Sequence, residues 1–547
     1  MPGTILENLS GKKLSVLVTV LLACQIGCFL VGLIAPSPAT SQGILSTVCV
    51  DHDPKNKDIN RWFTRSCPTQ VHLTDRQSTI GLDANSLVSL HVFVVEMPLY
   101  ALDYSRWQQN LVGVLQIDMV YQEDQKILDP VIELTLDCHL AYSDKDKGGS
   151  KTPWQYYAHS EVKRYMECTV NDEPHSEKNG YPYNCGMVPL FELGSLHHDY
   201  YLLNLRLPFN RTANKNVGLS RVEDIYLHTI HMNGGFTKVW VALKTFFFPI
   251  IIGIMVWFWN RVHILNRTPA LLEYMLMSLG GTLAFLNLPL EYLTLTFEMP
   301  YMLVLSDIRQ GVFYAMLLSF WLVFAGEHML IQDHGEKNSL KLYWKHLSTI
   351  VVGCFCLLIF DLCERGVQLV NPFYSIWVTP IGTNLALSFI ILAGISACIY
   401  FIFLCYMIWK VFRNISLKRA VLPSMSQARR LHYEGIIYRF NFLMLATVVC
   451  AAVTVISFIL SQVSEGQNKW DENMDIELSS ALHTGVYGMW NVYICAMLML
   501  YAPSHKQWPD DPICNDGEEV EFSRLPTEGT ANEISSLTSF AAKTSMD

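Results

Sequence analysis

The chain has 547 residues, of which 51% are hydrophobic and only 16% are charged, against about 25% charged residues in typical soluble domains. The mean hydropathy of +0.24 is high for a soluble chain and low for a chain that lies entirely in a membrane. Composition therefore excludes disorder, collagen and coiled coil, and it predicts one part in lipid and another outside it. The formal net charge of −10 argues against nucleic-acid binding, which usually leaves a basic footprint.

Apolar runs long enough to cross a membrane dominate the second half of the chain. A helix needs about 20 apolar residues to span the hydrocarbon core. The first candidate is 14–34, and the next 200 or so residues contain no run of that length. The other seven candidates are 239–259, 271–293, 311–330, 347–360, 381–409, 442–460 and 481–501. We therefore predict a multi-pass α-helical membrane protein with about eight transmembrane helices.

Basic residues in the short loops predict the orientation, because Lys and Arg accumulate on the cytosolic side. Lys12 and Lys13 precede the first run, and the strongest basic segment, which includes Arg429 and Arg430, lies before the seventh. The basic loops alternate consistently, which places both termini in the cytosol. The predicted organisation is a cytosolic N-terminus (1–13), a first transmembrane helix (14–35), a luminal block (36–237), a seven-helix bundle (238–501) and a disordered cytosolic tail (502–547).

The first run has a second interpretation, because a charged start and small residues after the apolar stretch also fit a cleaved signal peptide. Its apolar length exceeds the usual core of about 7–15 residues, which favours a retained anchor. Cleavage would leave seven spans and an outside N-terminus, as in a signalling receptor. The nearest matches to receptor signatures, Glu364-Arg365-Gly366 and Asn371-Pro372-Phe373-Tyr374, fall on the predicted luminal side.

The luminal block alternates apolar and polar residues with period two, which indicates half-buried strands. In 131–142, Ile132, Leu134 and Leu136 share one face, and Asp137 lies on the other. Further strands are predicted at 87–100, 111–121, 200–208 and 222–231. Several strands separated by polar turns predict an all-β sandwich or jelly roll between the first and second helices.

Five of the 15 cysteines fall in the luminal block, where an oxidising compartment permits disulfides. We favour the local pairs Cys49–Cys67 and Cys168–Cys185, each of which flanks a loop, while other pairings stay open. Cys138 lies on the apolar face of its strand and is predicted to be a buried free thiol. Asn210 begins an Asn-Arg-Thr sequon and is the predicted glycosylation site.

The sequence contains no His-Glu-x-x-His, Gly-x-Ser-x-Gly or Walker A pattern, so we predict a non-enzyme with no cofactor and no metal. His197-His198-Asp199 is interpreted as a polar approach to a strand, because it lacks the ligand spacing of a metal site. Ionisable residues near the spans are interpreted mostly as interfacial caps and ion pairs. A transporter would need several such residues at the midplane of its spans. The ionisable residues near the spans are Glu273, Glu291, Asp307, Arg309, Glu327, His328, Asp361, Glu364 and Arg365.

The predicted cytosolic loop before the seventh span contains Tyr433, Glu434, Gly435 and Ile436. This is a Tyr-x-x-apolar peptide, of the type that clathrin adaptors bind as an extended strand with pockets for the Tyr and the apolar residue. The alternative is that these residues simply begin the helix that enters the span.

Six separated segments, in the right order, resemble the Wntless family of Wnt cargo receptors. The similarity extends from the first span to the start of the tail and is strongest after about residue 230. The segments are 233–240 (Asn-Gly-Gly-Phe-Thr-Lys-Val-Trp), 307–321, 363–377, 429–435 (Arg-Arg-Leu-His-Tyr-Glu-Gly), 487–491 and 501–506.

The resemblance implies a luminal β-sandwich on a bundle whose last seven spans are receptor-like. It implies binding of acylated Wnt proteins through the luminal domain and the bundle, transport to the cell surface, and return through endosomes. Residues 433–436 match the family's endocytic Tyr-Glu-Gly-Leu with Ile for Leu, which implies a clathrin adaptor as partner and retromer as a further candidate. The implied locations are the Golgi, the endoplasmic reticulum, endosomes and the plasma membrane. The C-terminal Lys543-Thr-Ser-Met-Asp547 departs from the Lys-Glu-Ala-Gln-Glu-like retrieval sequence of vertebrate relatives.

An acyl chain carried by such a cargo needs shelter from water, because burying each CH₂ is worth about 0.8 kcal/mol. An apolar cavity in the bundle, open to the lumen, would shield the acyl chain from water. Membrane lipid is the other partner that we expect for the bundle. The candidate wall residues lie in the luminal halves of spans four to six and are Val312, Phe313, Leu317, Phe360, Leu385 and Phe389. The alternative is that these residues take part in ordinary helix packing.

Overall fold

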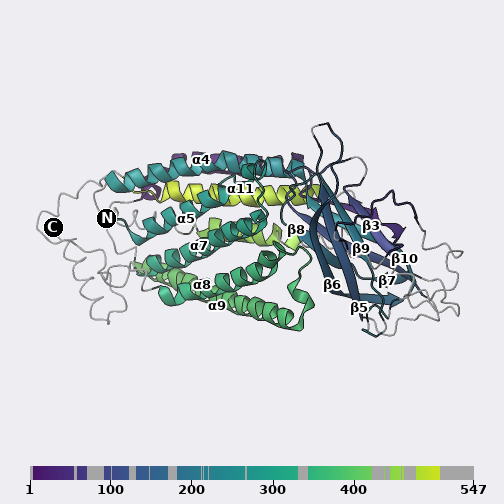
Figure 1. The fold of residues 1–547 in the computed structure, drawn as a ribbon. Coiled ribbons are helices and arrows are strands. Elements are labelled where there is room, and N and C mark those ends of the chain that lie inside the picture. The colour runs from purple at the N-terminus through teal and green to yellow at the C-terminus, as the bar shows by residue number, and fades with distance from the viewer. Residues whose placement is uncertain are drawn as a thin grey trace, which may run out of the picture.

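The computed structural model describes most of the chain between residues 4 and 504. Outside the described residues within this range lie 54–57, 59, 71–90, 100–101, 122–130, 147, 171–181, 211, 214, 218, 220, 265–267, 331–342, 422–436, 438–440, 442–443, 458 and 461–475. A β-rich domain forms one end of the molecule and a bundle of long helices extends from it (Figure 1). This architecture confirms the predicted fold class.

The helices are α1 (Ile5–Asn8), α2 (Gly11–Ile34), α4 (Gly234–Ile264), α5 (Leu271–Asn287), α6 (Glu291–Thr294), α7 (Met302–Leu330), α8 (Trp344–Asp361), α9 (Pro380–Val421) and α11 (Ile476–Leu500). Within the described residues, six segments are long and apolar enough to cross a membrane: α2, α4, α7, α9, α5 with α6, and α8 with the turn after it. Met444–Ser457, in the seventh predicted span, is a shorter apolar helix. The molecule is therefore a multi-pass membrane protein.

Two helices of the bundle, α7 and α8, are longer than the predicted spans. Helix α7 begins at Met302, nine positions before the predicted start at Gly311, so it carries Arg309 inside its second turn. Helix α8 continues into a π-helical turn, Leu362–Gly366, which lengthens a run that looked short in the sequence. Both extensions bring charged residues into helical segments.

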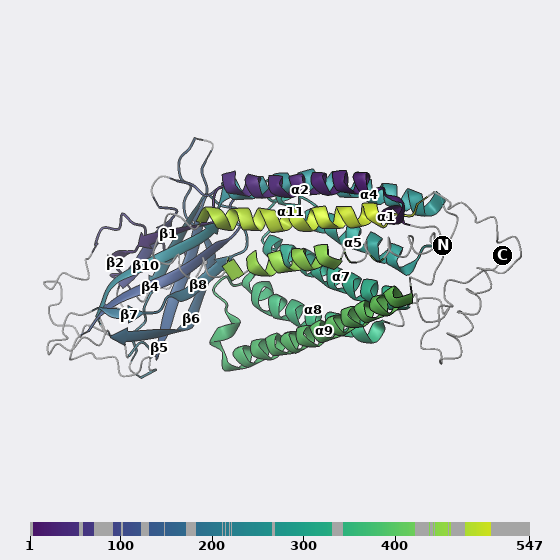
Figure 2. The same ribbon diagram turned by 180° about the vertical axis from the view of Figure 1, so that it is seen from behind.

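The β-domain consists of two antiparallel sheets that face each other (Figure 2). The four-stranded sheet has the order β1 (Ala39–Leu45), β10 (Arg221–Met232), β4 (Leu111–Val120), β8 (Val188–Leu193). The six-stranded sheet has the order β2 (Thr47–Val50), β3 (His91–Met97), β9 (Tyr200–Arg206), β5 (Val131–Ser143), β6 (Gln155–Val170), β7 (Tyr183–Cys185). The five predicted strands are all present, and β1, β2, β6, β7 and β8 were not predicted.

Alternation of side chains along the strands builds the core of this sandwich. Along β5, Leu134, Leu136 and Leu140 are fully buried, whereas Asp137 and His139 are half-buried on the outer face. Each buried leucine contributes on the order of 2 kcal/mol of hydrophobic stabilisation. The period-two pattern in the sequence therefore predicted the inner face of the sandwich correctly.

Helix α2 packs closely along α11, the last helix of the described residues (Figure 2). Glycines make this approach possible: a Cβ on Gly32 would lie 2.5 Å from the backbone of Ala481, and one on Gly488 would lie 2.4 Å from Cys28 Sγ. Small residues at helix interfaces allow such close packing in membranes. The first membrane-spanning helix, α2, is thus a packed member of the bundle.

The structure joins both favoured cysteine pairs of the β-domain. Cys49–Cys67 and Cys168–Cys185 form disulfides, with Cα–Cα separations of 6.1 and 4.1 Å. Cys138 is a free and fully buried thiol, as predicted, and burial raises its pKa. Asn210 is exposed, and its Oδ1 accepts a hydrogen bond of 2.7 Å from the hydroxyl of Thr212, the third residue of the sequon.

Candidate functional site

The β-sandwich is anchored to the helical bundle by the segment between α8 and α9. Phe373 in this segment is fully buried and belongs to the hydrophobic core of the sandwich, where its ring meets Phe191 of β8 at 6.0 Å. The backbone N–H of Glu192 donates to the carbonyl of Pro372 at 3.0 Å. Asn371-Pro372-Phe373-Tyr374, which resembled a receptor signature in the sequence, therefore attaches the two parts of the molecule.

A buried arginine reinforces this attachment. The guanidinium of Arg164, on β6, donates to the carbonyls of Pro189 at 2.8 Å, Leu190 at 3.2 Å and Phe373 at 2.6 Å. A charged donor that satisfies three carbonyls makes stronger hydrogen bonds than neutral donors do. Arg164 thus ties two strands of the sandwich to the α8–α9 segment, and nothing in its local sequence indicated this role.

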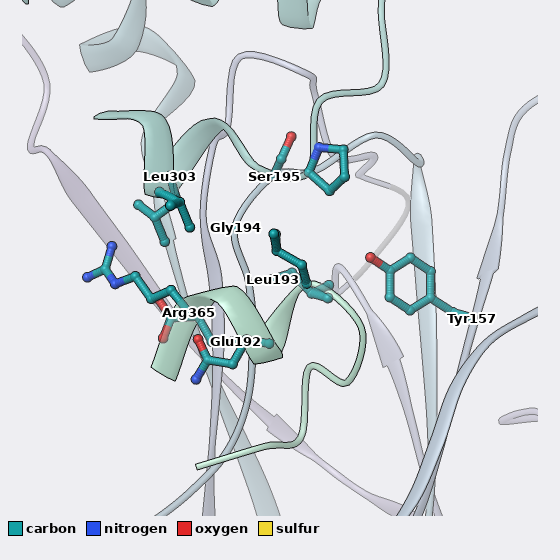
Figure 3. A pocket seen from close by; sticks show the side chains of 11 residues that line it. Tyr157, Glu192, Leu193, Gly194, Ser195, Leu303 and Arg365 are labelled. Atoms are coloured by element: carbon teal, nitrogen blue, oxygen red, sulfur yellow. The ribbon is translucent and has the colours of Figure 1, made fainter. Parts of the chain in front are cut away.

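A small cavity lies at the same junction (Figure 3). Its lining combines strand residues with residues from the helical bundle. The cavity volume is about 30 Å³, which holds roughly one or two water molecules and no fatty acyl chain. The lining residues are Tyr157, Glu192, Leu193, Gly194, Ser195, Pro300, Leu303, Val304, Arg365, Gln368 and Leu369.

Three charged side chains meet inside the bundle, close to its sandwich end. Lys244 Nζ of α4 lies 2.5 Å from Glu291 Oε1 of α6, and Arg309 of α7 reaches the same oxygen at 3.2 Å. The exposed fractions of the three side chains are 4%, 4% and 0%. One carboxylate therefore faces two cations. Glu291 and Arg309, interpreted from the sequence as interfacial caps or ion pairs, do form an ion pair, but a buried one. Lys244 was missed because it sits in an apolar run.

A second polar group lies next to these charges. Asn287 Nδ2 donates to Asn491 Oδ1 at 2.6 Å, and the hydroxyl of Tyr487 donates to Asn287 Oδ1. Trp240 packs against the ring of Tyr487 at 4.5 Å. These contacts link α4, α5 and α11, and they include residues of two sequence segments that resemble the Wntless family. Buried polar networks of this kind fix one arrangement of helices when their members are satisfied.

The six residues expected to line an acyl-chain cavity differ in burial. Phe313 and Leu317 are 1% and 2% exposed and belong to the core of the bundle. Val312 and Leu385 are each 43% exposed. Phe360 and Phe389 are half-buried, and the ring of Phe360 lies 6.2 Å from Trp377. Phe313 and Leu317 thus pack inside the bundle, while the other four lie on α7, α8 and α9 with accessible apolar surface.

The side chains of His197 and His198 point to different partners. His198 Nδ1 lies 3.1 Å from both carboxylate oxygens of Asp144, and its ring stacks on Tyr142 at 3.7 Å. His197 Nε2 accepts a hydrogen bond of 3.0 Å from the backbone N–H of Met299 in the segment before α7. His197 is therefore a contact between the sandwich and the bundle.

This contact requires a neutral His197, because a protonated Nε2 has no lone pair for the N–H of Met299. Burial lowers the pKa of His197 below its ordinary value. Nearby Glu298 opposes that shift, whereas Arg106 and His198 add to it. Burial also lowers the pKa values of His91 and His231 in the sandwich.

Acidification is expected to destabilise the sandwich and its junction. A histidine with a lowered folded-state pKa binds more protons when unfolded, so its stabilising effect is complete above about pH 6.5 and is lost as pH falls through the folded-state pKa. Thermal unfolding at pH 7.5 and 5 should show this loss. His197→Gln keeps an acceptor that does not titrate and should reduce the pH dependence, whereas the exposed control His52→Gln should not. An identical dependence in His197→Gln and wild type would contradict the assignment.

The predicted sorting motif at residues 433–436 and the predicted tail after residue 504 lie outside the described residues. Their expected roles therefore stay predictions.

The fold and the junction define a class: multi-pass membrane proteins in which a β-sandwich follows the first helix and docks on the rest of the bundle. Family comparisons give the same division. Residues 47–232 match the Wntless GOLD domain, and residues 233–505 match the Wntless-like transmembrane domain. The chain is 55% identical to Protein wntless of Drosophila virilis over 568 residues and 56% identical to those of Drosophila ananassae and Drosophila mojavensis over 571 and 568 residues, with 100% of both chains covered each time. The chain belongs to the Wntless family.

Proposed function

We propose that this protein is a non-enzymatic cargo receptor that binds lipid-modified Wnt proteins in the secretory pathway, carries them to the cell surface and returns by endocytosis. The observation that carries the proposal is the full-length similarity to the Wntless family, across both the GOLD domain and the transmembrane domain. In this arrangement the sandwich is luminal and holds the protein part of the cargo, and both chain termini are cytosolic.

The bundle offers apolar surface for the acyl chain of such a cargo. Val312 on α7 and Leu385 on α9 are each 43% exposed, and Phe360 on α8 is half-buried beside Trp377. We infer that the acyl chain enters the bundle among these three helices, near the attachment of the sandwich. Burial of a long chain there supplies on the order of 10 kcal/mol, at about 0.8 kcal/mol per CH₂. Phe313 and Leu317 would then support the wall from the core side.

The packing of α2 supports a retained first helix. Removal of this helix would leave Gly485 and Gly488 of α11 without Phe29 and Cys28, the side chains that approach them. The rival function, a seven-helix signalling receptor with a β-rich ectodomain, needs that removal. Terminal sequencing of the mature protein is expected to find the residues of α2 in place, and a mature chain that begins after Ala35 would favour the receptor instead.

Capture of acylated and unacylated Wnt is the experiment that tests the cargo function. The purified full-length protein should capture acylated Wnt and should capture little of a Wnt variant that lacks the acyl-bearing serine. Equal capture of both forms would contradict an acyl-binding bundle, and capture of neither would contradict the cargo function itself.

A pair of variants localises the acyl chain. Leu385→Trp fills accessible apolar surface on α9 and should weaken capture of acylated Wnt. Ile402→Trp, a matched change on the same helix at a side chain 66% exposed and about 25 Å along the helix from Leu385, should leave capture unchanged. Equal effects of the two variants would argue against this location.

Return from the cell surface depends, in this proposal, on Tyr433 and Ile436. Tyr433→Ala removes the aromatic anchor that an adaptor pocket binds, so uptake from the surface should slow and the surface population should rise. Tyr433→Phe, which keeps the ring, serves as the matched variant to show how much the hydroxyl adds. Antibody uptake in cells measures both, and unchanged uptake in Tyr433→Ala would leave this segment as the beginning of a helix.

A further inference from the structure

The outer face of the six-stranded sheet carries a group of potential metal ligands that no sequence pattern revealed. Asp137 and His139 of β5 and His159 of β6 place one carboxylate oxygen and two imidazole nitrogens within 4.8 Å of one another. The imidazole rings of His139 and His159 have centroids 4.7 Å apart, and His139 Nε2 lies 3.3 Å from Asp137 Oδ1. Two nitrogens and one oxygen form a ligand set that suits zinc and other divalent transition metals.

Strand register fixes this grouping. His139 and His159 are direct cross-strand partners, and Asp137 precedes His139 by two positions, so all three project from the same face. Directly opposed residues in an antiparallel pair have Cβ atoms about 4.5–5.5 Å apart. The sequence could not show the group because His159 lies 20 positions after His139, and a strand–loop–strand connection of that length gives no register by itself.

The charged side chains next to the group contact residues outside it. Arg206 of β9, the cross-strand partner of Asp137 on its other side, has its own carboxylate in Asp51 at 2.7 Å. Glu161, opposite Asp137 on β6, pairs with Lys215. Trp62 packs edge-on against His139 with ring centroids 6.5 Å apart and covers one side of the cluster. His159 is exposed, so the other side stays open to solvent.

We propose that Asp137, His139 and His159 bind one divalent transition-metal ion, of which Zn²⁺ is the representative, with water in the fourth position. Bonds of about 2.0–2.2 Å in a tetrahedral centre place the ligand atoms about 3.4 Å apart. The separations of up to 4.8 Å therefore need to close by at most about 1.4 Å to reach the tetrahedral spacing, which side-chain rotation on an accessible surface provides. The bound ion would cross-link β5 and β6 on the face of the sheet that lies away from the core. This inference is independent of the proposed cargo function.

Metal titration of the full-length protein, purified in detergent and treated with a chelator, tests the site. Calorimetry should show one Zn²⁺ bound per chain, and Co²⁺ should give the visible absorption of a tetrahedral centre and lose it when Zn²⁺ is added. His139→Gln and His159→Gln should each weaken Zn²⁺ binding by at least about tenfold. Mutation of a residue that only supports a ligand already costs about 10–100-fold in metal affinity, and loss of a ligand itself should cost no less.

His52→Gln is the matched control, because His52 is also an exposed histidine of the same domain and bonds to Thr69 at 3.0 Å outside the cluster. It should leave Zn²⁺ affinity unchanged. Failure of the wild type to bind Zn²⁺, or wild-type affinity in the His139→Gln/His159→Gln double variant, would overturn the proposal. Circular dichroism checks that each variant is folded. If His139→Gln does not fold, His159→Gln decides the question, because His159 is exposed and its replacement leaves the core intact.

Discussion

Replacing Glu291 with alanine is expected to lower the free energy of unfolding by about 3–5 kcal/mol, because it leaves two buried cations without their carboxylate. Lys244 lies 2.5 Å from Glu291 and Arg309 lies 3.2 Å from it, and neither cation is more than 4% exposed. Arg309 keeps one carbonyl, that of Leu288 at 2.8 Å, which does not compensate its charge. Unfolding of the purified protein in a denaturing detergent measures the effect.

Two comparisons separate the loss of the ion pair from the loss of packing. The triple change Glu291→Leu, Lys244→Met, Arg309→Met replaces all three charges with apolar groups, and it should recover most of the stability because buried charge clusters are often no better than apolar packing. Glu133→Ala breaks the exposed pair with Lys163, in which the two side chains are 45% and 58% exposed, and should leave the stability almost unchanged, because water and salt screen exposed pairs. An effect as small as this in Glu291→Ala would show that the cluster is hydrated in the membrane.

Phe373→Ala is expected to detach the sandwich from the bundle. The ring is fully buried in the core of the sandwich although it belongs to the segment between two transmembrane helices. Truncation of a buried phenylalanine costs about 3–5 kcal/mol, and here that cost falls on the contact between the two parts. Amide hydrogen exchange should therefore accelerate in β8, where Glu192 donates its N–H to Pro372, with a smaller change in the transmembrane helices.

Trp377→Ala provides the control for this prediction. Trp377 lies four positions later, is 45% exposed, and its ring lies 6.2 Å from that of Phe360 on α8. It should leave exchange in β8 unchanged, and Phe373→Leu, which keeps most of the apolar volume, should have an intermediate effect. If exchange in β8 is the same in Phe373→Ala and wild type, the hydrogen bonds of Arg164 and Pro372 are sufficient for docking.

The local elements were predictable because local patterns specify them. A run of about 20 apolar residues has few stable arrangements other than a membrane helix, and the alternation in 131–142 specifies which face of β5 is buried. The strands that were missed carry weaker patterns. Strand β1 (Ala39–Leu45) contains polar residues and has one buried side chain in seven positions. Its extended conformation therefore depends on pairing with β10, which a local pattern does not show.

The functional contacts were much less predictable from local patterns. Glu291 and Arg309 were noticed as charges near span ends, but their meeting with Lys244 depends on how three separate segments pack. Asn371-Pro372-Phe373-Tyr374 was compared with a receptor signature, and the structure makes Phe373 part of the sandwich core instead. The six acyl-cavity candidates share a predicted depth in the membrane, and depth alone does not specify which of them are buried: Phe313 and Leu317 are, whereas Val312 and Leu385 are exposed.

Local sequence patterns specify the class of this protein: its apolar runs, its alternating block and its six family-like segments. These are properties of residues close together in the chain, where side-chain period and apolar length act directly. The meetings of distant residues appear first in the three-dimensional structure: Lys244 with Glu291 and Arg309, Phe373 with Phe191, and His139 with His159. Helix rotation and strand register set those contacts, and both result from packing over the whole molecule.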